Sequence, residues 1–168
     1  MSEVLKVGTS ADFKRLIVDR DYIEHLEHPA DLRCAYHLAL GLFHLWDWTY
    51  WEFGGKPNWP YGSKEEYRAV LEAKCSYFGY MRDLANSVKH AEINRKPSTQ
   101  MEGLASTSIM PGAFDPRVFD PNVFQTEPFI VSRVAPGEVI GFERAAEAVM
   151  RMWNAMFAAH GWMEMGSA

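Results

Sequence analysis

Polar side chains interrupt a strongly apolar segment of the sequence between residues 30 and 53. His37, His44 and Asp47 stand there among aliphatic and aromatic residues. At about 100° per residue, a helix would place Arg33, His37, His44 and Trp51 within a sector of roughly 40°, with Asp47 close beside it. A histidine next to a carboxylate can carry a proton, fix a tautomer or contact a ligand. An acid in apolar surroundings also requires a donor, so we expect a His, Arg, Lys or Trp partner for Asp47.

A second polar group lies further along the chain, in a segment that also has helical spacing. Its members are Arg82, Asn86, Lys89 and His90. Helices joined by a short capped segment pack antiparallel, so we expect the two polar faces to meet inside an aromatic shell. Two interpretations remain open for this cluster: a structural network that satisfies buried polar groups, or a site that binds a ligand.

The spacing of these residues predicts neither a metal site nor a nucleophile. His44 and Asp47 are three residues apart, as helical metal ligands often are, but only one helix offers such a pair. Cys34 and Cys75 form no metal-ligand spacing. The sequence holds no G-x-S-x-G, P-loop or G-x-G-x-x-G pattern. We therefore predict no metal and no cofactor.

The elements that must position these residues form a mainly α, single-domain bundle of about five helices. Capping residues and Pro or Gly stops place the helices at residues 10–28, 30–53, 63–75, 77–93 and 142–160. The first four make up a core over 10–97, and the fifth is the C-terminal helix of segment 142–161. Ser10 is the expected cap of the first helix, and Ser63 with Glu66 forms a capping box at the third.

Residues 98–141 lose the helical period and form an irregular segment between the fourth and fifth helices. Phe129 to Val134 predicts a strand, and a turn at 135–138 leads to a second strand at 139–140, so we expect a small β-hairpin. Two similar Phe-Asp-Pro units occupy 114–123, where each Asp-Pro favours an extended or turning backbone. We expect segment 111–126 to contact a partner protein.

The overall composition limits the class of protein. The 168 residues include 22 acidic and 17 basic side chains, which gives a net charge of −5, and 48% of the residues are hydrophobic. A chain of this size can bury a full core without disulfides, so we expect reduced cysteines, a cytoplasmic location and no membrane segment. A general affinity for nucleic acid requires a basic surface, so the charge does not favour RNA as a partner.

Two sequence elements resemble a group of small uncharacterised bacterial and phage helical proteins. They are His44-Leu45-Trp46-Asp47-Trp48 (H-x-x-D-W) and Asp83-Leu84-Ala85-Asn86-Ser87-Val88-Lys89-His90 (D-x-x-N-x-x-K-H). The resemblance covers the first four helices and, loosely, the C-terminal helix that carries Trp153. It implies a helical fold and brings no established activity.

More distantly, the long central helices and the Arg and His content are similar to HEPN-type domains. These helical proteins include dimeric ribonucleases of toxin and phage-defence systems, and their R-x4-6-H pattern matches Arg20 to His25. The resemblance implies a homodimer in which Arg20 stabilises phosphate charge and His25 moves the proton of the attacking 2′-hydroxyl.

Three functions follow as expectations. The first is a non-enzymatic interaction protein whose core is held by a buried His44/Asp47/Asn86/His90 network. The alternative is a HEPN-like RNA-binding protein or metal-independent ribonuclease that uses Arg20 and His25. A lesser alternative is a helical protein that binds a metal or another small ligand.

Overall fold

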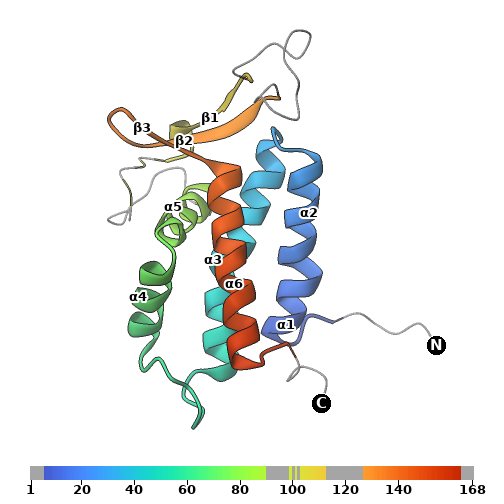
Figure 1. Ribbon diagram of the computed structural model, residues 1–168, viewed down its shortest axis with the longest axis vertical. Coiled ribbons are helices and arrows are strands. Elements are labelled where there is room, and N and C mark those ends of the chain that lie inside the picture. Colours follow the sequence, from blue (N-terminus) through green and yellow to red (C-terminus); the bar gives the residue numbers. More distant parts are fainter. Residues whose placement is uncertain (1–5, 90–98, 100, 102, 113–126, 164–168) are drawn as a thin grey trace, which may run out of the picture.

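The computed structural model describes residues 6–89, 99, 101, 103–112 and 127–163. This part of the chain is mostly helical and carries a small three-stranded antiparallel sheet (Figure 1). The expected mainly α class is confirmed. No helix in the described ranges combines the length and apolar character needed to cross a membrane.

The first helical segment runs continuously through three elements. They are α1 (Ser10–Phe13), the π-helix η1 (Lys14–Val18) and α2 (Asp19–Glu27). The expectation that Ser10 caps this segment is wrong: the cap is Thr9, whose Oγ1 accepts a hydrogen bond from the Asp12 N–H. Ser10 is fully buried and donates through both its N–H and its hydroxyl to Glu52. Ser10 therefore ties the first segment to the next helix.

That next helix, α3 (Leu32–Phe53), is the longest and contacts the first segment, α5 and α6. Asp31 caps it by accepting hydrogen bonds from the N–H groups of Arg33 and Cys34. A Cβ on Gly41 would lie 3.3 Å from Cγ2 of Val18. The missing side chain at position 41 therefore lets the π-helical turn approach α3 closely.

Three further helices follow: α4 (Lys64–Lys74), α5 (Tyr77–Lys89) and α6 (Phe142–His160). The capping box of Ser63 and Glu66 is confirmed at the start of α4. Gly161 ends α6 in the left-handed conformation, with φ 65°, as its position after the helix predicts. The end of the expected helix 77–93 lies outside the described residues.

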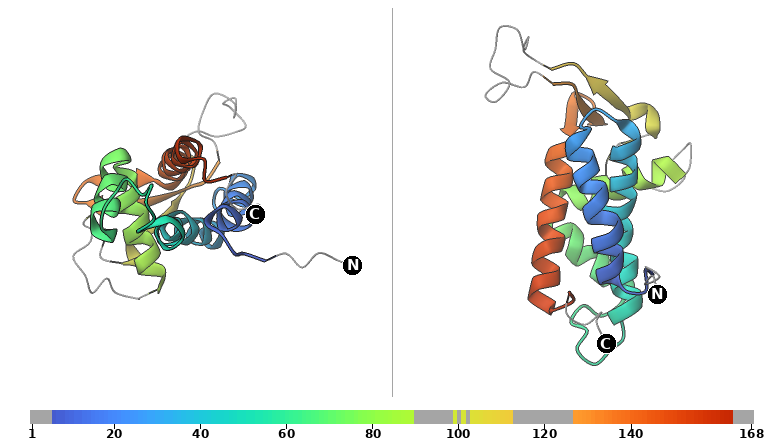
Figure 2. Two further views of the ribbon diagram at one scale, coloured as in Figure 1. Left: turned by 90° about the horizontal axis from the view of Figure 1, so that it is seen from below. Right: turned by 90° about the vertical axis from the view of Figure 1, so that its right-hand side faces the viewer.

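The first helical segment, α3 and α6 run side by side, and α5 runs across α3 and α6 (Figures 1 and 2). The expectation that α3 and α5 are neighbours is confirmed, but α5 crosses α3 and does not pack antiparallel to it. The contact between them is apolar: Phe43 of α3 packs against Phe78 of α5, and Phe78 packs against Trp153 of α6. The Trp153 indole N–H donates to the Leu42 carbonyl at 2.9 Å, which fixes α6 to α3.

The sheet lies at one end of these helices (Figure 1). β2 (Phe129–Ala135) pairs with β3 (Glu138–Gly141), which confirms the expected hairpin, and also with β1 (Thr107–Met110), a strand that the sequence did not predict. The Ser132 hydroxyl of β2 lies 2.8 Å from the Tyr80 hydroxyl and 2.8 Å from Oγ1 of Thr107. This chain of hydroxyls joins α5 to the sheet. Residues 113–126, most of the expected contact segment 111–126, lie outside the described residues.

Candidate ligand-binding groove

The polar sector of α3 meets α2 at one end, where Arg33 pairs with Glu24 at 2.7 Å, and α4 at the other, where Asp47 pairs with Lys64. His37 is exposed, whereas His44 and Asp47 are half-buried. Asp47 lies 3.4 Å from Nδ1 of His44 and forms an ion pair with Nζ of Lys64 at 2.6 Å, so the expected donor is present. Burial acts to raise the pKa of Asp47, but the His44 hydrogen bond and the Lys64 ammonium outweigh it and bring the pKa below its ordinary value.

The polar residues of α5 form a separate group. Arg82 pairs with Glu72 of α4 at 3.0 Å and with its neighbour Asp83 at 3.3 Å. Asp83 is 1% exposed and accepts hydrogen bonds from the N–H and the hydroxyl of Thr99. These contacts stabilise the fold around the C-terminal half of α5.

The two polar groups are not joined into one cluster. No hydrogen bond or ion pair of the described residues connects His44 or Asp47 to Arg82 or Asn86. The physical reason is that aromatic rings fill the contact between α3 and α5, so the polar sector of α3 is turned away from it. The side chain of Lys89 and all of His90 lie outside the described residues.

Arg20 and His25 lie on different sides of α2. Arg20 is exposed, whereas His25 is 1% exposed and packs edge-to-face on Phe142, with ring centroids 4.8 Å apart. Within the described part of the chain, neither ring nitrogen of His25 has a hydrogen-bond partner, and burial lowers the pKa of the imidazole. Five residues of α-helix turn by about 140°. One chain therefore does not bring these two side chains to a common open site.

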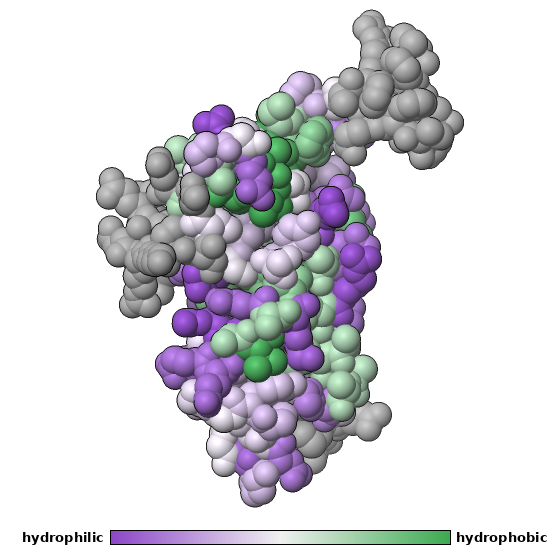
Figure 3. All heavy atoms as spheres, turned by 60° about the vertical axis from the view of Figure 1, so that its left-hand side comes forward, coloured by the Kyte–Doolittle hydropathy of each residue, from purple (hydrophilic) through white to green (hydrophobic). Residues whose placement is uncertain are grey.

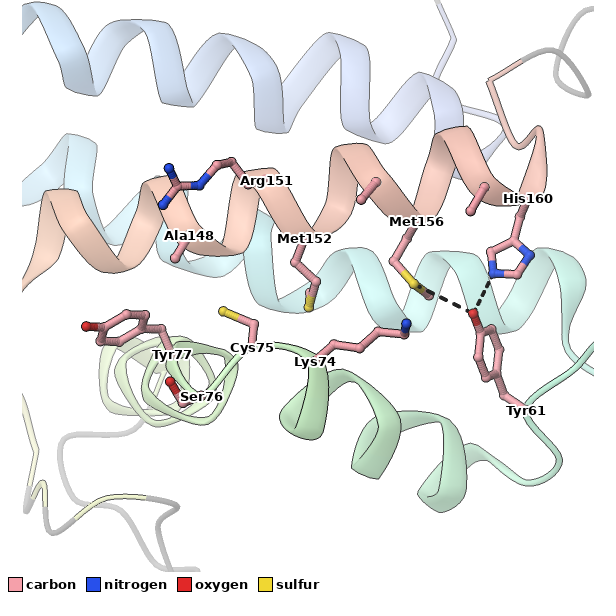
Figure 4. Close-up of a pocket in the computed structure, with 12 residues that line it drawn as sticks. Tyr61, Lys74, Cys75, Ser76, Tyr77, Ala148, Arg151, Met152, Met156 and His160 are labelled. Atoms are coloured by element: carbon pink, nitrogen blue, oxygen red, sulfur yellow. Dashed lines mark hydrogen bonds between the residues drawn. The ribbon is translucent and has the colours of Figure 1, made fainter.

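A groove of about 640 Å³ lies between α6 and the junction of α4 with α5 (Figure 4). Its floor is the stripe of α6 that carries Met152 and Met156 between alanines, and its opposite wall includes Lys74 and Cys75. Figure 3 shows the α4 side of the molecule, where hydrophobic residues lie among hydrophilic ones. The groove is thus apolar along its floor and polar at its edges.

Tyr61 and His160 close one end of the groove. The Tyr61 hydroxyl lies 2.5 Å from Nε2 of His160 and 3.6 Å from Sδ of Met156. Burial lowers the pKa of His160, and the positive charge of Lys74 lowers it further; burial also raises the pKa of Tyr61. At neutral pH both groups are therefore uncharged, and the tyrosine O–H donates to the imidazole nitrogen, which is a better acceptor than sulfur.

Aromatic neighbours hold this pair in place. Tyr61 stacks on Tyr67 at 5.0 Å between ring centroids and contacts Trp59 edge-to-face at 5.1 Å. The His160 ring stacks on Trp162 at 4.7 Å. Because the rings on both sides are packed, Tyr61 and His160 form a preorganised wall.

The charges around the groove have one sign. Among the twelve residues that line it, Lys74 and Arg151 are cationic, and none is an aspartate or glutamate. Figure 4 shows the Lys74 side chain extending toward Met156 and the Tyr61–His160 pair. Arg151 forms an exposed ion pair with Glu147 at 3.0 Å, so its charge is partly compensated. The Lys74 end is therefore suited to an anionic group, and the floor to an apolar one.

The arrangement supports binding better than catalysis. Lys74 can attract an anion, Met152 and Met156 can contact an apolar group, and Cys75 supplies a half-buried free thiol. Among the described residues, no group of three or more His, Cys, Asp or Glu side chains is placed to hold a metal ion. An anionic cofactor would use the same Lys74 end of the groove.

None of the residues of this groove was singled out as a site residue from the sequence. The alanines and methionines of α6 recur at helical spacing, and such a stripe predicts core packing in most proteins. Tyr61 and His160 are 99 residues apart, so no local pattern connects them. The weak signal was His160, a polar residue at the end of an apolar stripe.

Comparison with protein-family models, with curated proteins and with solved structures gives no match for this chain.

Proposed function

We propose that this protein binds small amphipathic organic anions, alkyl or aryl carboxylates and their analogues, in the groove along α6. The observation that carries the proposal is the sign of the charges: a chain with net charge −5 lines this groove with two cations and no carboxylate. This function belongs to the small-ligand class expected as the lesser alternative from the sequence.

The dimensions and chemistry of the groove support the proposal. Pockets for small molecules commonly measure about 300–1,000 Å³ and are mostly apolar with a few polar groups, and this groove measures about 640 Å³. Met152 and Met156 offer flexible apolar contacts. The anionic head would lie at Lys74, and the tail would lie along α6.

The test is calorimetric titration with hexanoate, octanoate and decanoate, and with octylammonium as the control of opposite charge. Each methylene buried in the groove should tighten binding by about two- to fourfold. Octylammonium, which carries the same tail, should bind more weakly than octanoate. Equal affinity for the two heads would exclude an anion site, and the absence of a chain-length effect would exclude an apolar floor.

Lysine variants assign the head group. Lys74→Gln should lower the affinity for octanoate by about three- to fivefold, the range expected for the loss of one partly exposed charge. Lys6→Gln is the matched control, because Lys6 is exposed and does not line the groove. A loss of affinity in both variants would indicate a general charge effect and would contradict the assignment.

The two cysteines locate the ligand. Cys75 is half-buried and lines the groove, whereas Cys34 is buried, and its burial raises the pKa of its thiol to about 11. Reaction with iodoacetamide should therefore label Cys75 first, because the thiolate is the reacting form. Bound octanoate should slow this labelling. Labelling that stays at the ligand-free rate under saturating octanoate would place the ligand elsewhere.

A second candidate function is an interaction protein that forms a homodimer of single helical domains. Ile23 and Leu26 of α2 are 57% and 48% exposed and three residues apart, so they are neighbours on one helix face. In a twofold dimer this face would pack against its copy. Sedimentation equilibrium should then give a dimer that Ile23→Lys dissociates and that Val139→Lys, at another exposed apolar position (61%), leaves intact. A monomeric parent protein would exclude this candidate.

The HEPN-like alternative, with RNA as the substrate, requires Arg20 and His25 at one open site. The burial of His25 gives that alternative no support from geometry. Incubation with a mixed RNA pool in the absence of metal tests it directly. If the protein is a ribonuclease that uses these residues, the parent protein should cleave the pool and the Arg20→Ala variant should not.

A further inference from the structure

Two tryptophans form a corner on the surface of α3, away from the groove along α6. The Trp48 and Trp51 rings meet at 75° with their centroids 6.2 Å apart. Phe13 also stacks on Trp48, with ring centroids 5.0 Å apart. Trp51 is 71% exposed, the highest exposure among the large hydrophobic side chains that are exposed in the described part of the chain.

The corner borders a hollow of about 350 Å³. Val7, Gly8 and Asp47 complete its lining, so that the charged group of this hollow is a carboxylate. Indole faces attract cations because the ring carries a negative face. Two indole rings and a carboxylate in the lining of one hollow together favour a positively charged ligand.

The chain already binds one ammonium group in this way beside the hollow. Nζ of Lys64 lies 4.7 Å from the centroid of the Trp46 ring and 2.6 Å from Oδ1 of Asp47. Asp47 also lines the hollow, together with Trp48 and Trp51. None of the described residues that line it supplies a cation.

We propose that the hollow between Trp48, Trp51 and Asp47 binds a quaternary ammonium group. The reason for full methylation is the state of Asp47, whose two oxygens are already engaged by Lys64 and His44. A primary ammonium entering the hollow would give up hydrogen bonds to water and find few acceptors. A trimethylammonium group needs none, and it gains both the charge attraction and apolar contact with the rings.

The decisive comparison is choline against 3,3-dimethylbutan-1-ol, its uncharged isostere. Both are titrated into the protein, and the indole N–H signals in the NMR spectrum report binding. Choline should bind about three- to thirtyfold more tightly than the alcohol, with the largest shifts at Trp48 and Trp51. Equal affinities would show a merely apolar surface, and shifts confined to other tryptophans would place binding elsewhere; either result overturns the proposal.

Substitutions distinguish the contribution of the Trp51 ring to choline binding from that of the Asp47 charge, and both from a loss of the fold. Trp51→Leu should abolish the preference for choline, and Trp51→Phe should retain part of it, because phenylalanine keeps an aromatic face. Asp47→Asn should weaken the binding of choline and leave the affinity for the alcohol unchanged. A Trp51→Leu protein that still prefers choline would contradict the assignment, and the exposed position of Trp51 makes loss of the fold an unsuitable explanation for any change.

A quaternary ammonium group can belong to a free small molecule or to a trimethylated lysine of another protein. Titration with a short peptide that carries trimethyllysine, and with its unmethylated copy, distinguishes the two sources. Tighter binding of the methylated peptide than of choline assigns the hollow to a protein partner, and the reverse assigns it to a small molecule. An unmethylated peptide that binds as tightly as the methylated one overturns the proposal.

Discussion

Asp83 of α5 holds Thr99, sixteen residues further along the chain, by two hydrogen bonds, since the backbone N–H and the hydroxyl of Thr99 both donate to Oδ2 of Asp83. The other carboxylate oxygen accepts from Arg82, and the Asp83 side chain is 1% exposed. Thr99, which precedes the sheet in the sequence, is thereby anchored on α5.

Removal of the Asp83 carboxylate should destabilise the folded protein. We expect Asp83→Ala to lower the free energy of unfolding by about 3 kcal/mol, because the Thr99 N–H and the Arg82 guanidinium lose a buried acceptor. The Asp83→Asn variant keeps one oxygen, so its free energy of unfolding should lie between those of the parent protein and Asp83→Ala. Urea denaturation followed by circular dichroism measures the difference, and a loss below about 1 kcal/mol would mean that the site behaves as an exposed one.

Asp47→Ala is the matched comparison on α3. As an acid in an apolar stripe, Asp47 would be expected from the sequence to contribute about 2–5 kcal/mol to stability. The structure corrects this value, because the Asp47 side chain is 38% exposed and Lys64 44%. Solvent screens such a pair, so we expect a loss of less than about 1 kcal/mol. The same urea titration checks it, and a loss as large as that of Asp83→Ala would contradict the difference in burial.

The helices were predictable because their signals are local. The capping box at Ser63 and the left-handed Gly161 act within a few residues, and both form as expected. The error at Thr9 has the same origin: two neighbouring hydroxyl residues fit the cap equally well, and Ser10 is drawn instead to Glu52, which is 42 residues away. β1 was missed because it has four residues, and three of them are exposed.

The candidate site was much less predictable. A helical wheel correctly groups His37 and His44 on one side of α3, but it does not say which neighbour that side meets. Lys64 of α4 supplies the charge beside Asp47, and α5 presents Phe78 to α3. The pairing of Tyr61 with His160 depends on how α6 packs against the rest of the chain, which no spacing within one segment encodes.

The stability of the protein should depend on pH through His25. Burial lowers the pKa of His25 in the folded state below the ordinary 6.5, so the unfolded chain binds a proton that the folded chain resists. Stability is therefore fully present above pH 6.5 and is lost as pH falls through the lower, folded-state pKa, by up to about 1.4 kcal/mol per pH unit.

His25→Leu removes this titration and both unpartnered ring nitrogens. Its unfolding free energy should fall less than that of the parent between pH 6.5 and pH 5, as measured by urea denaturation at each pH. The comparison at pH 8 isolates the change in packing against Phe142 from the change in titration. Parallel pH profiles for the two proteins would show that the folded state accommodates a charged His25.

The last prediction concerns the coupling of Lys74 to His160. Burial and the Lys74 charge hold the pKa of His160 below its ordinary value, so Lys74→Gln should raise that pKa, as read from the imidazole signals in an NMR titration. Protonation of His160 adds a positive charge to the groove, so an anion should bind more tightly as pH falls below 6.5 and through the depressed pKa. Octanesulfonate is the suitable probe, because its own charge does not change in this range. By linkage, bound octanesulfonate should also raise the pKa of His160. If the affinity for octanesulfonate is the same at pH 7 and pH 5 although His160 titrates between them, the anion does not lie at the Tyr61–His160 end of the groove.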